Sequence, residues 1–163
     1  MGTMQIRKYP DSILRQECQA VAEIMDKEIR LFEDMLTTMR SSQGIGLAAP
    51  QVGINKRIIV IDIGEGPIKI ANPEIIKLGK AKESMGEGCL SVPDAIVDVS
   101  RPSEVIIKGL NEKNRPVEIK AKGLLARVIL HELDHLNGKL IVDYMSFLRK
   151  IDYRLKTRNK LHM

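Results

Sequence analysis

Residues 131–135 read His-Glu-Leu-Asp-His, and this short pattern constrains the fold more than any other part of the chain. In an α-helix, side chains four positions apart lie one turn apart on the same face, so His131 and His135 can reach one metal ion. Glu132 then lies beside them as a candidate general base. The alternative is a chance pair of histidines on an amphipathic helix. Because a catalytic metal normally has three protein ligands, the metal interpretation requires a third ligand elsewhere in the chain.

The helix that carries this motif is expected to begin at Gly123 and to end near Gly138. Leu124 and Val128 precede His131 at helical spacing and therefore share its face. An apolar wall next to the metal ligands suits a substrate with an apolar side chain beside the bond that is attacked. The alternative is that both side chains simply pack in the core.

A second informative stretch, Gly44–Gly53, reads Gly-Ile-Gly-Leu-Ala-Ala-Pro-Gln-Val-Gly. This content of glycine and proline excludes a helix interior, and small residues let the backbone approach a ligand closely. Gln51 is its only polar side chain. We expect Ile45 to face Leu124 and Val128 from this stretch. A plain connection between a helix and a strand is the alternative.

A third stretch, Gly86–Pro93, is predicted to be a loop from its composition and contains Cys89. The residues alone leave three uses for this cysteine open: a reactive nucleophile, a metal ligand or an inert core thiol. The chain has two cysteines, Cys18 and Cys89, which do not form the pattern of a disulfide framework. We expect Cys18 to be a small buried side chain.

The remaining pattern predicts helices at both ends of the chain. One helix is expected to run from Asp26, as its N-cap, to about Met39, with Ile29 and Phe32 on its buried face. Ser146 is expected to cap a last helix that runs to about residue 160.

Runs rich in β-branched residues predict strands, and a turn is expected at Asn72-Pro73. The expected strands cover residues 57–63, 68–71, 74–82, 105–110 and 117–121, with a short edge strand at 5–9. Together these elements predict an α+β fold in which antiparallel sheets pack around the central metal-binding helix, with a C-terminal helix.

The length of 163 residues suits one domain, and we expect residues 1–163 to form a single catalytic domain. No apolar run approaches the roughly 20 residues needed to span a bilayer, and the N-terminus has no signal-peptide pattern. We therefore expect a cytoplasmic protein without a membrane partner.

The net charge of +5 matters where the charges cluster, and they do so near the C-terminus. The cluster comprises Arg149, Lys150, Arg154, Lys156, Arg158 and Lys160. A solvated basic helix end is one explanation, and contact with phosphate groups of RNA is the other. No recognition motif accompanies the charge, so sequence-specific binding of nucleic acid is not expected.

Taken together, three stretches resemble the peptide deformylase family. They are Gly44–Gln51, Glu87–Ser91 and His131–His135, and their order and separation also match. The likeness extends from Tyr9 to Asp143. The family removes the formyl group from the N-terminal formyl-methionine of new polypeptides, so the resemblance implies N-formylmethionyl nascent peptides as substrates.

The resemblance also implies roles for individual residues. It implies that Cys89, His131 and His135 hold one divalent metal ion, with water in the fourth place, and that this water attacks the formyl carbon. It implies that Glu132 handles the proton. The oxyanion would be bound by the side chain of Gln51 and the backbone N–H of Leu90. Residues expected to bind the substrate are Ile45, Gly46, Gly88, Leu124 and Val128.

The expected identity of the metal ion follows from the family resemblance and from ligand chemistry. The family usually works with iron(II), so we expect iron(II) in the cell. Zinc(II), nickel(II) or cobalt(II) could replace it in a purified sample. In some relatives the C-terminal helix docks on the ribosome, so the resemblance favours a ribosome contact through the basic cluster.

Two positions depart from the common family pattern. Asp94 stands where many members have glycine, and Leu130 stands where many have glutamine. Both departures put details of substrate preference in doubt, and neither affects a proposed ligand. Arg101 matches a family arginine that pairs with Glu87, which we interpret as a brace for the Cys89 segment. An ordinary surface ion pair, worth roughly 0–1 kcal/mol, is the alternative.

Two other functions remain open at this point. A metalloprotease of the His-Glu-x-x-His type would need a third ligand downstream, where Asp143 and His162 are the candidates. A structural zinc protein would need four protein ligands, and the sequence offers three.

Overall fold

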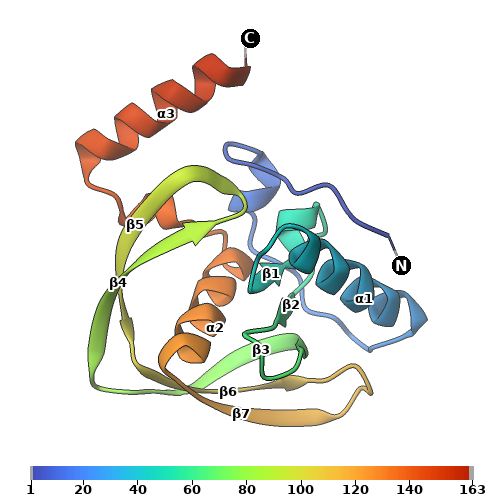
Figure 1. The fold of residues 1–163 in the computed structure, drawn as a ribbon. Helices are drawn as coiled ribbons and strands as arrows, with labels where there is room; N and C mark the ends of the chain where they lie inside the picture. The colour runs from blue at the N-terminus through green and yellow to red at the C-terminus, as the bar shows by residue number, and fades with distance from the viewer. Residues whose placement is uncertain (1, 162–163) are drawn as a thin grey trace.

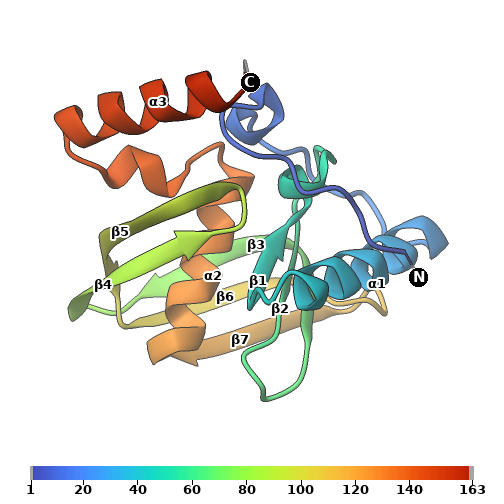
Figure 2. The same cartoon turned by 45° about the horizontal axis from the view of Figure 1, so that its top comes forward.

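The structure is a computed structural model that describes residues 2–161. Helix α2 (Gly123–Leu136) runs through the middle of the molecule, with strands on both sides of it (Figure 1). Helix α1 (Asp26–Ser41) lies along one side, and helix α3 (Phe147–Leu161) extends at the opposite end (Figure 2). The prediction of an α+β fold with antiparallel sheets and a C-terminal helix is confirmed.

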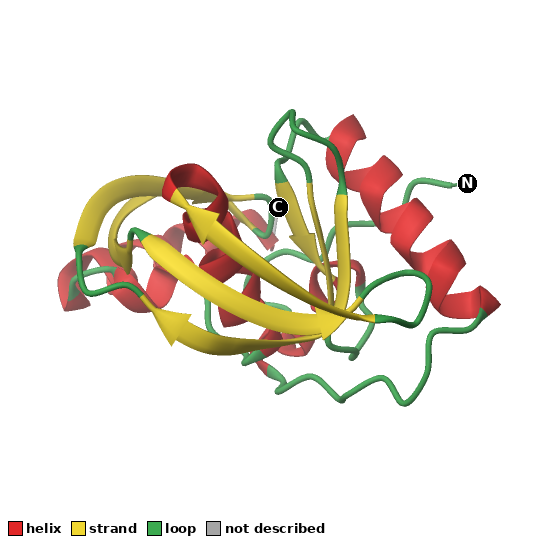
Figure 3. Cartoon of the chain, turned by 90° about the horizontal axis from the view of Figure 1, so that it is seen from below, coloured by secondary structure: helices red, strands yellow, loops and turns green. Residues whose placement is uncertain are grey.

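The strands form two antiparallel sheets. The larger has the order β1-β2-β3-β6-β7, and the smaller pairs β4 with β5. Seen from below, the long strands of the larger sheet curve across the molecule (Figure 3). The strand bounds are β1 Gly46–Ala48, β2 Ile58–Ile61, β3 Ile68–Leu78, β4 Lys82–Cys89, β5 Val92–Pro102, β6 Glu104–Leu110 and β7 Pro116–Lys122. The strands predicted at residues 105–110 and 117–121 are thus β6 and β7, which pair as an antiparallel hairpin.

Helix α2 is apolar because it lies in the core. Ile129, Leu133 and Leu136 are buried together with residues from β2, β3 and β6. The helix begins at the predicted Gly123, and Gly138 follows its end with φ 71°, a left-handed conformation that favours glycine. Apolar burial therefore fixes the position and rotation of the helix that presents both motif histidines.

The predicted turn at Asn72-Pro73 is wrong, because β3 continues through it with a shift in register. Asn72 adopts φ 51°, and its amide side chain forms hydrogen bonds with a backbone segment that is not part of the sheet. It accepts a hydrogen bond from the Val21 N–H at 2.8 Å and donates one to the Val21 carbonyl at 2.7 Å. The chain is therefore kinked at this point and does not reverse.

The loop predicted for Gly86–Pro93 is also wrong, except at Leu90 and Ser91, the two residues between β4 and β5. Gly86 and Glu87 belong to β4, where they pair with Asp98 and Val97 of β5. The glycines are needed because the side chain of Ile96 lies over them; a β-carbon on Gly86 would lie 2.9 Å from Ile96. Composition therefore indicated a loop where close packing requires glycine.

The N-terminal predictions need two further corrections. Met25, rather than Asp26, is the N-cap of α1, where its N–H donates to the Glu28 carboxylate at 3.1 Å, and Ile29 is 40% exposed rather than buried. Residues 5–9 form no strand of a sheet. Their backbone instead donates from Arg7 to the Gln51 carbonyl and from Tyr9 to that of Ser91.

Helix α3 contacts the segment that begins β5. The Tyr153 hydroxyl donates to the Pro93 carbonyl at 2.9 Å, and Lys160 Nζ lies 2.9 Å from Asp94 Oδ2. Arg149 donates to the Ile96 carbonyl. Within residues 2–161, no helix combines the length and the apolar character needed to cross a bilayer.

Candidate active site

Three side-chain atoms of the expected ligand set converge at one point. Cys89 Sγ lies 3.3 Å from His135 Nε2, which in turn lies 3.3 Å from His131 Nε2. All three ligand atoms lie within 4.8 Å of one another. Around a tetrahedral ion, two nitrogen ligands lie about 3.3 Å apart, and a nitrogen and a sulfur about 3.6 Å apart. The spacing therefore fits a divalent ion bound by one thiolate and two imidazoles.

His131 is oriented by the carboxylate of Glu87. Its Nδ1 lies 2.9 Å from Glu87 Oε2, which leaves Nε2 directed at Cys89 and His135. Burial alone lowers the pKa of His131, but hydrogen bonds to Cys89 and Glu87 outweigh it and raise the pKa to about 10. A carboxylate behind a ligating imidazole is a common arrangement that fixes which nitrogen faces the metal.

Glu87 in turn is held by two arginines. Arg101 donates from Nε and Nη2 to the two carboxylate oxygens at 2.6 and 2.9 Å, and Arg127 donates from Nη1 at 2.8 Å. Burial alone would raise the pKa of Glu87, but hydrogen bonds from Arg101 and His131 lower it to about 2. Since Glu87 and Arg101 are only 6% and 4% exposed, the pair is a buried brace and not an ordinary surface pair.

Glu132 and His135 are both deeply buried, with 3% and 1% of their surface exposed. Burial raises the pKa of Glu132 to about 7 and lowers that of His135 well below its usual value. Within the described part of the chain, Glu132 Oε2 has no hydrogen-bond partner. A β-carbon on Gly46 would lie 2.3 Å from Glu132 Oε1, so glycine is required there. A buried carboxyl group with a pKa near neutrality suits proton transfer.

Gln51 is fixed with its amide nitrogen toward the cysteine. Its Oε1 accepts a hydrogen bond from the Ala48 N–H at 2.9 Å. Its Nε2 donates to Ser91 Oγ at 3.1 Å and lies 3.6 Å from Cys89 Sγ. Because the Ala48 N–H can bond only to an acceptor, it determines which way the amide points. The second N–H of Gln51 therefore points toward Cys89 Sγ, beside the candidate metal site.

The site opens into a cleft of about 600 Å³ with apolar walls. Helix α2 contributes Leu124 and Val128, and the strand side contributes Met85 and Ile96. Leu124 is 49% exposed, which is more than a core position would allow. The cleft is also lined by the other residues expected to bind the substrate or the oxyanion, namely Ile45, Gly46, Gly88, Gln51 and Leu90.

The alternative ligand Asp143 lies outside this cluster. It accepts hydrogen bonds from Arg15 at 2.6 and 3.0 Å and from the Leu140 N–H at 3.0 Å. His162 lies outside the described residues. The geometry therefore gives no support to Asp143 as a third metal ligand.

Arg127, Ser91 and Asp134 also belong to the site, although sequence reasoning did not select them. Asp134 accepts hydrogen bonds from Arg101 Nη1 at 3.0 Å and from the Tyr144 hydroxyl at 2.7 Å. One signal was available for Arg127, which stands in an otherwise apolar part of the helix, one turn before His131.

Comparison with known proteins gives a consistent result. A family model described as polypeptide deformylase matches residues 3–150. A peptide deformylase of Clostridium botulinum is 50% identical over 143 residues, which cover 88% of this chain and 97% of that protein. One of Halothermothrix orenii is 50% identical over 145 residues and covers 88% of this chain and 94% of its own length.

Solved structures agree over most of the chain. The peptide deformylase of Ehrlichia chaffeensis in complex with actinonin aligns with a TM-score of 0.95, 36% identity and 98% coverage of both chains. That of Thermotoga maritima aligns with a TM-score of 0.86 and 40% identity, covering 88% of this chain and 98% of its own.

Proposed function

The chain belongs to the polypeptide deformylase family, and from this premise we propose which of its residues carry out the reaction and how. It is a hydrolase that removes the N-terminal formyl group from newly made polypeptides. The reaction breaks the bond between the formyl carbon and the amine nitrogen; formate and a free N-terminus are the products. The observation that supports the residue assignment is the convergence of three ligand atoms beside Glu132 in an apolar cleft.

We assign metal binding to Cys89, His131 and His135. A divalent ion held there supplies a Lewis acid and lowers the pKa of water from 15.7 to about 7. We propose iron(II) as the ion in the cell, because the family usually works with it and because metal availability, rather than affinity, decides which ion such a donor set holds. Nickel(II) or cobalt(II) can take the same place in a purified sample.

Glu132 is the proposed proton carrier. It accepts a proton from the attacking water and gives it to the amine nitrogen as the bond to the formyl carbon breaks. Its pKa of about 7 allows both directions of transfer at neutral pH. Gln51 Nε2 and the Leu90 N–H donate to the formyl oxygen, on which negative charge develops. Each such donor can lower the barrier by a few kcal/mol.

The apolar cleft is the proposed site for the first side chain of the substrate. Leu124 and Val128 form one wall, and Ile45, Gly46 and Gly88 lie along the cleft. An unbranched apolar side chain such as methionine fits these walls, whereas an acidic one would lose its hydration there.

The enzyme assay compares two activities of the metal-loaded protein. Formate release from a formyl-Met peptide is expected, and cleavage inside a peptide with a blocked N-terminus is not. Cys89→Ala is expected to lose most of the metal and the activity, because two imidazoles alone hold an ion poorly. Full metal occupancy in Cys89→Ala would remove the thiolate from the proposed site.

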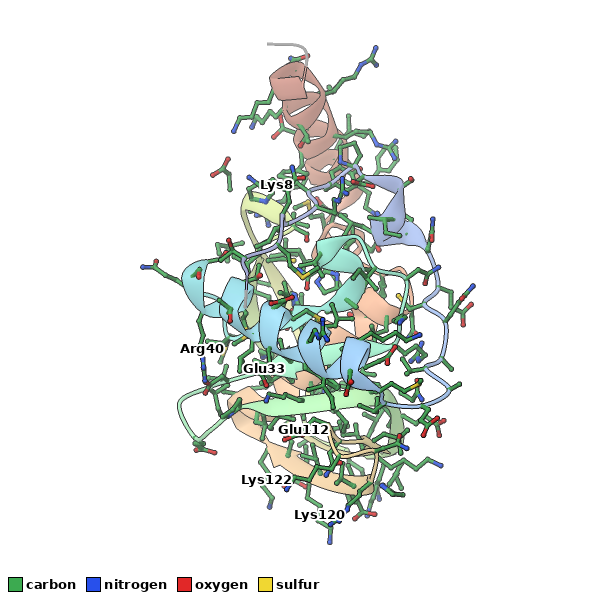
Figure 4. All side chains as sticks on the ribbon, turned by 90° about the vertical axis from the view of Figure 1, so that its right-hand side faces the viewer. Lys8, Glu33, Arg40, Glu112, Lys120 and Lys122 are labelled. Carbon is green, nitrogen blue, oxygen red and sulfur yellow. The ribbon has the colours of Figure 1, made fainter. Side chains whose placement is uncertain are left out.

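We also propose that helix α3 contacts the ribosome. Helix α3 and Lys8 lie toward one end of the molecule, whereas Lys120 and Lys122 lie at the other end, on β7 (Figure 4). Nascent chains emerge from an RNA-rich particle, so phosphate contacts would place the enzyme at its substrate. We further propose that residues 1–163 act as one catalytic unit in the cytoplasm.

Charge reversal tests the ribosome contact without deleting the helix. Lys156→Glu with Arg158→Glu on α3 is expected to weaken salt-sensitive sedimentation with ribosomes, while hydrolysis of short formyl peptides continues. The matched control, Lys120→Glu with Lys122→Glu, changes the net charge equally at the far end of the molecule. Equal binding by both variants would exclude α3 as the contact.

A further inference from the structure

Arg127 connects helix α2 to both strands of the smaller sheet. In addition to its bond to Glu87, its Nη1 donates to the Val99 carbonyl of β5 at 2.8 Å. Its Nη2 donates to the Glu83 carbonyl of β4 at 2.7 Å. The residue is 7% exposed, so each of these bonds lies in a shielded environment. A buried planar guanidinium with several fixed partners has little freedom to move.

The two carbonyls lie next to one wall of the cleft. Glu83 precedes Met85 by two positions on β4, and Met85 pairs with Val99 across the sheet. Met85 and Ile96 form the strand wall, and Leu124 and Val128 of α2 form the opposite wall. Arg127 stands between those two residues on α2 and itself lines the cleft. The Arg127 side chain therefore belongs to the helix wall and is hydrogen-bonded to the backbone of the strands on the other side.

From these contacts we propose that Arg127 is a positioning residue that sets the spacing of the cleft walls and thereby the selectivity for the first side chain of the substrate. The proposal rests on the assignment of this cleft as the side-chain site. Without the guanidinium, two strand carbonyls lose their donors, and the smaller sheet loses a link to the helix. The walls can then separate, and bulkier side chains enter more easily relative to methionine.

The test compares kcat/KM for formyl-Met and formyl-Phe tripeptides that are otherwise identical. In Arg127→Met we expect the Met-to-Phe ratio to fall about fivefold to tenfold, chiefly through a higher KM for the methionine substrate. This ratio does not depend on the fraction of active enzyme. A loss of stability or of metal affects both substrates equally, so a merely structural role leaves the ratio unchanged. Arg127→Lys retains the charge but only some of the contacts. Its Met-to-Phe ratio should therefore lie between that of Arg127→Met and that of the unaltered protein.

Arg57→Met is the matched control at the other end of the helix. Arg57 Nη1 donates to the Leu136 carbonyl at 3.4 Å and to Asn137 Oδ1 at 3.0 Å, away from the cleft walls. Its removal should leave the selectivity ratio unchanged. A ratio in both Arg127 variants within twofold of the unaltered protein would overturn the inference. If the unaltered protein itself does not distinguish the two substrates, the assignment of the cleft fails instead.

Discussion

At the scale of single residues, the site depends on one carboxyl group that is buried and poised near neutrality. Glu132→Gln keeps the size of the side chain but cannot carry a proton. We expect it to retain the metal and to lower kcat by about 10²–10⁴-fold, with a small change in KM. Metal analysis and steady-state kinetics of formate release measure the two quantities. Turnover close to normal at pH 7 would exclude Glu132 as the proton carrier.

Gly46 controls the space in which that carboxyl group sits. A β-carbon would lie 2.3 Å from Glu132 Oε1 and 2.8 Å from the Val128 side chain, so one of them must move. Displacing a reacting group by about 1 Å can cost 10²-fold in rate, and we expect Gly46→Ala to reduce kcat/KM by about that factor.

Gly44→Ala provides the comparison for this effect. Its β-carbon would meet the end of the Leu90 side chain at 2.9 Å, which can rotate away, so its loss should be much smaller. Equal activities for the two alanine variants would contradict the argument from space.

The site residues differ in how far the sequence could reveal them. The relative position of the two motif histidines follows from the sequence itself, since four-residue spacing on a helix is a local property. Arg127 and Ser91 act through partners that lie far away along the chain, such as Glu83 and Gln51. A hydrogen bond between positions far apart in the chain produces no local sequence pattern, so only the structure identifies these residues.

At the scale of elements, prediction succeeded where apolar periodicity decides the outcome. Helix α2 and the β6–β7 hairpin lie close to their predicted bounds, because their buried faces repeat regularly. It failed at Asn72 and at Gly86, where turn-forming residues stand inside strands. In both cases a tertiary contact, with Val21 or with Ile96, decides the conformation.

The kink in β3 makes this testable. Asn72→Ala removes both bonds to Val21 and places at φ 51° an alanine, which tolerates this left-handed conformation less well than asparagine. We expect the free energy of unfolding to fall by about 1–3 kcal/mol, measured by urea denaturation. Asn159→Ala on the exposed face of α3 is the control and should change stability by less than about 0.5 kcal/mol. Equal stability for the two variants would mean that β3 holds its kink without Asn72.

At the scale of the whole molecule, the buried ion network joins the smaller sheet to the central helix. Glu87 has a pKa of about 2 in the folded protein against 4.5 for an ordinary glutamate. The unfolded chain therefore binds a proton at higher pH than the folded one, and stability is lost as the pH falls from about 4.5 to about 2. The difference in pKa corresponds to about 3 kcal/mol.

Urea unfolding of the metal-stripped protein between pH 4.5 and 2.5 measures this dependence. In that range His131 is protonated in both states and contributes no slope. Glu87→Gln removes the titrating group but keeps the shape, so its stability should fall less steeply with acid. Parallel curves for the two proteins would show that Glu87 does not link the sheet to the helix through its charge.

Helix α3 touches the enzyme's body at the carbonyls of Pro93 and Ile96 and at the side chain of Asp94. These residues also line the cleft. A partner that binds α3 is therefore also linked, through these contacts, to one side of the cleft. With its 15 residues the helix is about 22 Å long, which an extended chain of about seven residues also spans. An enzyme bound to a surface through α3 would therefore remove the formyl group while only a short length of the growing chain extends from that surface.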